Sequence, residues 1–168
     1  KNKIEAVVIT GGEPTLQKDL ISFIKKIKKN GFLVKLDTNG TNPDVVEKLL
    51  KENLVDYIAM DIKNDFLDNH YEMITGISDI KKIKQSIKLI MDSNIDYEFR
   101  TTVAPGITKE NILNIAKDIT GAKKYYLQKF KDTDVLDNEC KKILWLTDDE
   151  LNKIQKEIKN LFVECKVR

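Results

Sequence analysis

The most restrictive segment of this sequence runs Val7-Val8-Ile9-Thr10-Gly11-Gly12-Glu13-Pro14-Thr15. A short β-branched run that leads directly into paired glycines predicts a buried parallel strand ending in a loop. Gly11 and Gly12 allow positive φ and close approach of a ligand to the backbone, and Pro14 suits the first turn of a following helix. Glu13 is therefore expected at the C-terminal end of a strand, where α/β folds place their binding groups. A carboxylate there can receive an ammonium group, and a plain strand-to-helix turn with a solvated Glu13 stays open as the alternative.

Strands and helices alternate along the whole chain. The predicted strands cover residues 4–9, 32–36, 55–62, 97–103 and 124–130. Between and after them, apolar residues recur at helical spacing, with an irregular connection around residues 63–77. Five strand–helix units in alternation predict an α/β fold with a parallel sheet and right-handed crossovers, in a single domain over residues 1–168. An open doubly wound sheet and a partial barrel both fit this pattern.

Polar side chains collect where the predicted strands end. In chain order they are Glu13, Asp37, Thr38, Asn39, Asp61, Lys63, Arg100, Thr102, Gln128 and Lys129. Strand ends in register define the mouth of a barrel or a crevice, so we expect these groups to share one binding site. Carboxylates at this mouth suit an amine, and Lys63 or Arg100 suits a carboxylate, so the pattern predicts an amino-acid-like ligand.

Structural roles for the same residues stay open at this point. Asp61 and Lys63 lie two apart on a strand and could form an internal ion pair. Arg100 could pair with Glu98 at the rim. The segment 37–40 could be only an Asx-type turn in which a glycine supplies the positive φ.

Composition narrows the classes of function. With 29 basic and 27 acidic residues the chain has no strong field for a polyanion, which disfavours nucleic acid as the main partner. The sequence has no apolar run long enough to span a bilayer and no signal peptide, so we expect a cytoplasmic protein. Cys140 and Cys165 form no CxxC or Cys/His cluster and are interpreted as reduced, structural thiols rather than metal ligands. The one histidine, His70, is interpreted as a surface residue.

Taken together, three motifs resemble the radical S-adenosylmethionine (SAM) superfamily. Gly11-Gly12-Glu13-Pro14 is similar to its GGEP motif, and the segments 37–40 (DTNG) and 60–63 (MDIK) are similar to strand ends of the glycyl-radical-enzyme activases. Within that group, the segments 99–103, 126–130 and 167–168 are most similar to the activating protein of anaerobic ribonucleoside-triphosphate reductase. Pyruvate formate-lyase activating enzymes share several of these segments.

The resemblance implies a partial (β/α)6 barrel with SAM across the strand ends. It implies that Glu13 contacts the ammonium group of SAM, within the loop of Gly11, Gly12 and Pro14. It implies that the carboxylate end of SAM is held, directly or through a monovalent cation, by Asp37, Thr38, Asn39, Asp61 and Lys63. Arg100 and Gln128 would line the same mouth. The implied reaction is reductive cleavage of SAM by a 4Fe–4S cluster, after which a 5′-deoxyadenosyl radical takes hydrogen from a glycine of the partner enzyme. An electron donor is implied as a second partner.

The chain departs from the family pattern before GGEP. The family carries a CxxxCxxC cluster loop there, whereas the ten residues before Gly11 contain no cysteine. We therefore interpret the chain as a partial barrel that lacks its first βα unit and the cluster ligands, and expect it to be inactive alone. The edge of the strand at residues 4–9 is then expected to promote self-association. Two alternatives are a non-catalytic SAM- or protein-binding remnant and an unrelated α/β enzyme of aldolase or phosphate-binding type. The last is disfavoured because no Gly-rich phosphate loop follows the late strands.

Overall fold

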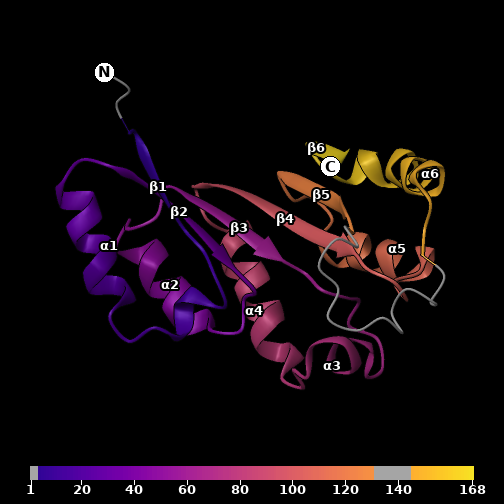
Figure 1. The fold of residues 1–168 in the computed structure, drawn as a ribbon, viewed down its shortest axis with the longest axis horizontal. Helices are drawn as coiled ribbons and strands as arrows, with labels where there is room; N and C mark the ends of the chain where they lie inside the picture. The colour runs from indigo at the N-terminus through magenta and orange to yellow at the C-terminus, as the bar shows by residue number, and fades with distance from the viewer. Residues whose placement is uncertain (1–3, 131–144) are drawn as a thin grey trace. The chain divides into compact units, whose positions relative to one another are not determined.

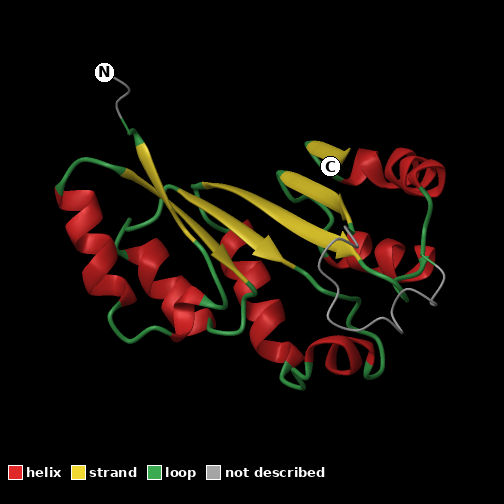
Figure 2. Cartoon of the chain, in the orientation of Figure 1, coloured by secondary structure: helices red, strands yellow, loops and turns green. Residues whose placement is uncertain are grey.

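The computed structural model describes residues 4–130 and 145–168 of the chain. The chain divides into two compact units, Lys1–Asp61 with Asp79–Glu98, and Ile62–Ser78 with Phe99–Arg168. Each unit alternates helices with parallel strands (Figures 1 and 2).

The first unit is built around three parallel strands. Its elements are β1 (Ala6–Ile9), the 3-10 turn η1 (Pro14–Leu16), α1 (Leu20–Lys29), β2 (Leu33–Thr38), α2 (Pro43–Lys51), β3 (Tyr57–Asp61) and α4 (Ile80–Met91). β1 pairs with β2 and β2 with β3, both parallel. Helices α1, α2 and α4 lie on one face of these strands (Figure 1).

The register of β1 and β2 positions the first loop. Ile9 at the end of β1 lies opposite Leu36, so β2 extends two residues further, through Asp37 and Thr38. Val34 and Leu36 are buried, while Lys35 and Asp37 on the opposite face of β2 are partly exposed. The strand end therefore presents Asp37 on one face and Thr38 on the other, beside the loop that follows β1.

The second unit contains the later strands. Its elements are α3 (His70–Thr75), most of β4 (Asp96–Val103), α5 (Lys109–Asp118), β5 (Lys124–Lys129), α6 (Asp148–Ile158), the 3-10 turn η4 (Lys159–Leu161) and β6 (Glu164–Val167). β4 pairs with β5 and β5 with β6, again parallel. Helices α5 and α6 each begin with a capping box, at Thr108 and Thr147. In each box a threonine directly precedes the apolar helical run, and its hydroxyl accepts from the backbone N–H three residues further on.

Two elements correct the sequence prediction. The chain has a sixth strand, β6, where only five were expected, and Glu164 to Val167 pair with residues 124–127 of β5. The connection expected to be irregular contains a six-residue helix, α3, which ends at Gly76 in the left-handed region. Neither is long enough to show a clear hydrophobic period.

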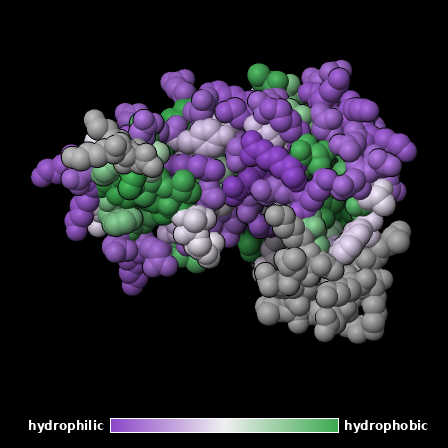
Figure 3. Space-filling model, turned by 45° about the horizontal axis from the view of Figure 1, so that its top comes forward, coloured by the Kyte–Doolittle hydropathy of each residue, from purple (hydrophilic) through white to green (hydrophobic). Residues whose placement is uncertain are grey.

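Apolar side chains are exposed along β1 and the start of β2. Ile4, Val8 and Leu33 are each more than half exposed, and a hydrophobic patch is visible on this unit at the left of Figure 3. β1 pairs with β2, and no other partner of β1 is found within the described residues. Self-association through this edge remains a prediction. None of the helices in the described ranges has the length and apolar character needed to cross a bilayer.

The Gly40 position offers a test of how the turn after β2 packs against β3 and α4. Gly40 has φ +76°, its carbonyl accepts a hydrogen bond from Ser86 of α4, and a Cβ there would collide with the Met60 side chain. We predict that Gly40→Ala lowers the free energy of unfolding by about 2–5 kcal/mol, because positive φ and overpacking both oppose the methyl group. Urea denaturation measures this.

Gly31→Ala is the matched control. Gly31 lies in the same unit with φ +82°, but open space surrounds the Cβ position. Only the backbone cost of about 1–2 kcal/mol should appear there. Equal losses in the two variants would contradict the packing argument.

Candidate functional site

The carboxylate of Glu13 joins the loop after β1 to the end of β2. Oε1 accepts hydrogen bonds from the backbone N–H of Thr15 (3.1 Å), from the Thr15 hydroxyl (2.6 Å) and from the Thr38 hydroxyl (2.8 Å). Oε2 accepts one from the backbone N–H of Asn39 (2.6 Å). Glu13 is only 9% exposed, so the alternative of a solvated side chain in a plain turn is wrong. The side chain also caps η1, as its position before Pro14 suggests.

The segment after β2 is a tight turn as well as a partner of Glu13. The side-chain oxygen of Asn39 accepts from the backbone N–H of Thr41 (3.0 Å), and the hydroxyl of Thr38 accepts from the N–H of Gly40 (3.1 Å). The Asx-turn interpretation is therefore confirmed for Asn39. It does not exclude the binding-site interpretation, because Thr38 and the Asn39 backbone also donate to Glu13.

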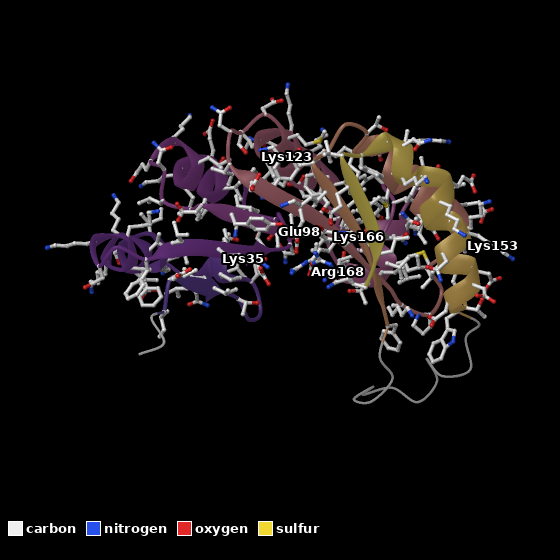
Figure 4. The ribbon with its side chains drawn as sticks, turned by 90° about the horizontal axis from the view of Figure 1, so that it is seen from above. Lys35, Glu98, Lys123, Lys153, Lys166 and Arg168 are labelled. Carbon is white, nitrogen blue, oxygen red and sulfur yellow. The ribbon has the colours of Figure 1, made fainter. Side chains whose placement is uncertain are left out.

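Asp37 belongs to a charged cluster on the other face of β2. The Lys35 ammonium lies 3.6 Å from Asp37 Oδ1 and 3.9 Å from Glu98 Oε1. The Tyr57 hydroxyl donates to Glu98 Oε2 at 2.8 Å, and Lys35 also lies over the Tyr57 ring. Figure 4 labels Lys35 and Glu98 among the side chains. Thr10, just before the glycine pair, lies 3.4 Å from Asp37 Oδ2, so Asp37 is a second link between this loop and β2.

The structure brings part of the predicted site together in each unit. Gly11, Gly12, Glu13, Pro14, Asp37, Thr38 and Asn39 gather in the first unit, and Asp61 ends β3 there. Lys63, Arg100 and Gln128 belong to the second unit. Within it, the N–H of Ile62 donates to the carbonyl of Arg100 (2.8 Å), which places the backbone before Lys63 beside β4. The Gln128 side chain lies 3.4 Å from the hydroxyl of Thr102.

A second polar cluster was not predicted from the sequence. Asp65 is fully buried, and its carboxylate accepts from Asn111 (3.1 Å) and Asn114 (2.9 Å) of α5 and contacts Nδ1 of His70 at 2.7 Å. Burial alone would raise the pKa of Asp65, but the hydrogen bonds from Asn114, His70 and Asn111 outweigh it and hold the pKa below its usual range. His70 does lie at the surface, with 38% of its side chain exposed, but its ring is also held by the buried Asp65 carboxylate, which the sequence did not suggest.

The residues of the first unit fit one end of an amino-acid-like ligand. Gly11 and Gly12 have φ +98° and +49°, and nothing lies within 4 Å of where a Cβ would stand on either. Their exposed backbone therefore leaves room for a ligand group beside the Glu13 carboxylate, whose Oε2 accepts a single hydrogen bond from a described residue. A carboxylate oxygen can accept more than one, so an ammonium group could be received there.

The described residues do not fit an iron–sulfur cluster. Within residues 4–130 and 145–168, no three His, Cys, Asp or Glu side chains are placed to hold a metal ion. Cys165 is buried on β6, and burial raises the pKa of its thiol to about 11, which disfavours the thiolate that a cluster requires. Cys140 lies outside the described residues.

Comparison with known proteins gives the family. Residues 1–119 match the Radical SAM superfamily, and the chain belongs to this superfamily. A protein of Methanocaldococcus jannaschii, named as a candidate glycyl-radical enzyme activating enzyme, is 39% identical over 98% of this chain and 70% of its own length. A probable GTP 3′,8-cyclase of Pyrococcus horikoshii is 31% identical over 68% of this chain and 36% of its own length. The chain thus spans about a third of the cyclase.

Solved structures share the fold. A domain of pyruvate-formate lyase-activating enzyme from Bacteroides vulgatus matches with a TM-score of 0.78 at 15% identity, over 98% of this chain and 99% of that chain. Streptococcus suis SuiB bound to S-adenosylmethionine matches with a TM-score of 0.69 at 14% identity, over 96% of this chain and 39% of that chain. The predicted α/β fold of the radical SAM partial-barrel type is therefore confirmed, with six parallel strands. The superfamily implies SAM and a 4Fe–4S cluster as cofactors.

We predict that Glu13→Ala lowers the free energy of unfolding by about 3 kcal/mol, because it leaves the Asn39 N–H and the donors of Thr15 and Thr38 without their acceptor. Glu13→Gln should lose less, since one carbonyl oxygen can still serve the hydroxyls. Urea denaturation measures both variants, with the exposed Glu5→Ala as control. A Glu13→Ala chain as stable as the wild type would contradict the structural role of this carboxylate.

The Asp65 cluster predicts a pH dependence of stability. A carboxyl whose pKa is lowered by folding stabilises the native state above its unfolded pKa of about 3.8, and this contribution is lost as the pH falls through the folded pKa. Asp65→Asn should therefore cost about 2 kcal/mol at pH 6, and progressively less as the pH falls below 3.8. Denaturation of both proteins across this range tests the prediction. A difference between wild type and variant that grows as the pH falls would refute it.

Proposed function

We propose that this chain is the SAM-binding part of a radical SAM activating enzyme that generates a glycyl radical on anaerobic ribonucleoside-triphosphate reductase. The observation that carries the proposal is the Glu13 carboxylate, which fastens the open Gly11-Gly12 loop to the end of β2. The 39% identical relative supports the activase class, because its name describes an enzyme that activates a glycyl-radical enzyme.

The ligand would be held by its methionine end. The loop of Gly11, Gly12 and Pro14 would receive the ammonium group, with Glu13 as the anionic partner. The carboxylate end would be served by the remaining site residues, directly or through a monovalent cation: Asp37, Thr38, Asn39, Asp61, Lys63, Arg100 and Gln128. These groups orient SAM, and the carbon–sulfur bond that breaks belongs to the cofactor chemistry.

The chain by itself is proposed to be inactive. Reductive cleavage of SAM needs a cluster, and the described residues provide no site for one. In this proposal the cluster ligands and the contact with an electron donor lie outside the described residues. A SAM- or protein-binding barrel without catalysis is the alternative, and it would use the same contacts to SAM.

The identity of the partner enzyme rests on motif similarity. The segments 99–103 and 126–130 favour the activating protein of anaerobic ribonucleotide reductase over that of pyruvate formate-lyase. The domain of pyruvate-formate lyase-activating enzyme shares the fold at 15% identity. A similarity at this level does not favour either of the two candidate partner enzymes over the other. Pyruvate formate-lyase is therefore kept as the alternative target.

Isothermal titration calorimetry with SAM tests the ligand. We expect the chain to bind SAM, and Asp37→Asn to weaken the binding at least tenfold, because the monovalent cation that would join Asp37 to the SAM carboxylate loses a charge-assisted interaction worth about 1.5–3 kcal/mol. Asp79→Asn, an exposed carboxylate in the same unit, should bind as the wild type does. No measurable heat with the wild-type chain would reject the proposed site.

Product analysis separates an inactive chain from an active one. The purified chain, incubated with iron, sulfide, SAM and dithionite, is expected to form no 5′-deoxyadenosine. Formation of 5′-deoxyadenosine would overturn the proposed inactivity and would show that the chain holds a cluster.

A further inference from the structure

An open groove of about 650 Å³ lies between α3 and α5, entirely within the second unit. One side comes from the segment after Ile62 and from α3, and the other from the turn after β4 and the start of α5, all of which can be followed in Figure 1. We call it the α3–α5 groove. Its principal lining residues are Leu67, His70, Met73, Ile74, Pro105 and Asn111.

One wall of the groove is apolar and exposed. Leu67 is 53% exposed, Met73 74% and Ile74 49%, all within eight residues of sequence. Exposed apolar side chains that gather beside a cavity mark an interaction site more often than isolated ones do. Methionine is common at such surfaces because its flexible side chain adapts to different partners.

At the polar end of the groove, hydrogen bonds fix the ring of His70 and leave its Nε2 atom without a role in them. Asp65 fixes the His70 ring through Nδ1, and Asn111 and Asn114 fix the Asp65 carboxylate. Asp65 Oδ1 lies 2.7 Å from Nδ1 of His70, so a ring that carries a single proton, placed on Nδ1 to donate to this carboxylate, has Nε2 as an acceptor. A half-exposed acceptor beside an apolar wall suits the backbone N–H of a bound polypeptide.

The charge of the groove points away from phosphate-bearing ligands. Its charged lining residues are Asp65 and Glu110, and no Lys or Arg of the described residues lines it, although the chain has 29 of them. The N-terminus of α5 carries the capping box of Thr108 and Asn111, in which the N–H of each residue already donates to the side chain of the other. A nucleotide or nucleic acid would find little to bind here, whereas a neutral or basic polypeptide segment complements the groove.

We propose that the α3–α5 groove docks a polypeptide segment of the glycyl-radical enzyme that this chain serves. An apolar side chain of that segment packs on Leu67, Met73 and Ile74, and a backbone N–H donates to Nε2 of His70. The proposal rests on the proposed function, because it takes its occupant from a reaction whose substrate is a protein. It concerns the second unit alone and is independent of the Glu13 loop.

The test is a binding measurement with surface variants that leave the core intact. Immobilised full chain is titrated with purified anaerobic ribonucleotide reductase, and separately with pyruvate formate-lyase, of the source organism. We expect the double substitution Met73→Ser with Ile74→Ser to weaken binding of one of these enzymes at least tenfold. Val163→Ser, which alters an 86% exposed apolar side chain of the same unit away from the groove, should change the affinity less than twofold.

The polar contact has its own variant. His70→Phe keeps a ring but removes both nitrogens, the Nε2 acceptor and the Nδ1 that contacts Asp65. We expect it to weaken docking about five- to tenfold, while SAM binding measured by calorimetry stays unchanged. Partner binding equal to wild type in both the double variant and His70→Phe would overturn the proposal. The proposal would also be overturned if neither enzyme bound to the wild-type chain.

Two further outcomes distinguish other failures. If the chain alone forms a dimer in sedimentation and the double variant dissociates it, a second copy occupies the groove and the proposal is overturned. If SAM fails to bind while the partner enzyme binds through the groove, the proposed cofactor site is wrong and the docking proposal stands.

Discussion

The hydrogen bonds to Glu13 hold the loop after β1 against the end of β2, where the proposed SAM site lies. Two paired parallel strands need not have loops that touch, because the backbone hydrogen bonds between the strands stop where the shorter strand ends. Here the buried Glu13 carboxylate links the two strands beyond the end of β1, because it accepts hydrogen bonds from Thr15, Thr38 and Asn39. Losing this acceptor would leave several buried donors unsatisfied, which costs more than an average hydrogen bond contributes.

This fastening explains why the glycines can remain open. Gly11 and Gly12 both adopt positive φ with no side chain nearby, a conformation that a free loop would sample only some of the time. Glu13 on one side of the two glycines and the Thr10–Asp37 contact on the other fix the ends of this segment. The backbone of Gly11 and Gly12 therefore keeps its conformation while it stays exposed. A preorganised loop of this kind binds a ligand at a smaller entropic cost than a mobile one.

The sequence predicted most of this arrangement and missed what depends on distant contacts. The alternation of strand and helix periodicity along the sequence predicted five of the strands and the helices between them. The segment Gly11-Gly12-Glu13-Pro14 predicted a carboxylate at the end of a strand. The strand β6 was missed because four residues after a helix carry no period, and its pairing with residues 124–127 is a tertiary contact. Asp65 was missed because Asn111 and Asn114 lie 46 and 49 residues away. An Asp-x4-His spacing before a short helix, with two asparagines three apart on a later helix, is the signal that could have suggested it.

Glu13 and Asp65 follow the same design with different neighbours. Each is a buried carboxylate in a loop that follows a strand, and each is held by donors from another element. Asp65 is fully buried and can act on a ligand only through the His70 ring that it positions, whereas Oε2 of Glu13 can still accept a hydrogen bond beside the bare backbone of Gly11 and Gly12. The groups that donate hydrogen bonds to Glu13 and to Asp65 determine which kind of ligand group each site can receive. Hydroxyls and backbone N–H groups around Glu13 leave a negative site for a cationic group, whereas a singly protonated ring that donates to Asp65 through Nδ1 has Nε2 as an acceptor. The first suits the ammonium group of a small ligand, and the second suits the N–H of a polypeptide.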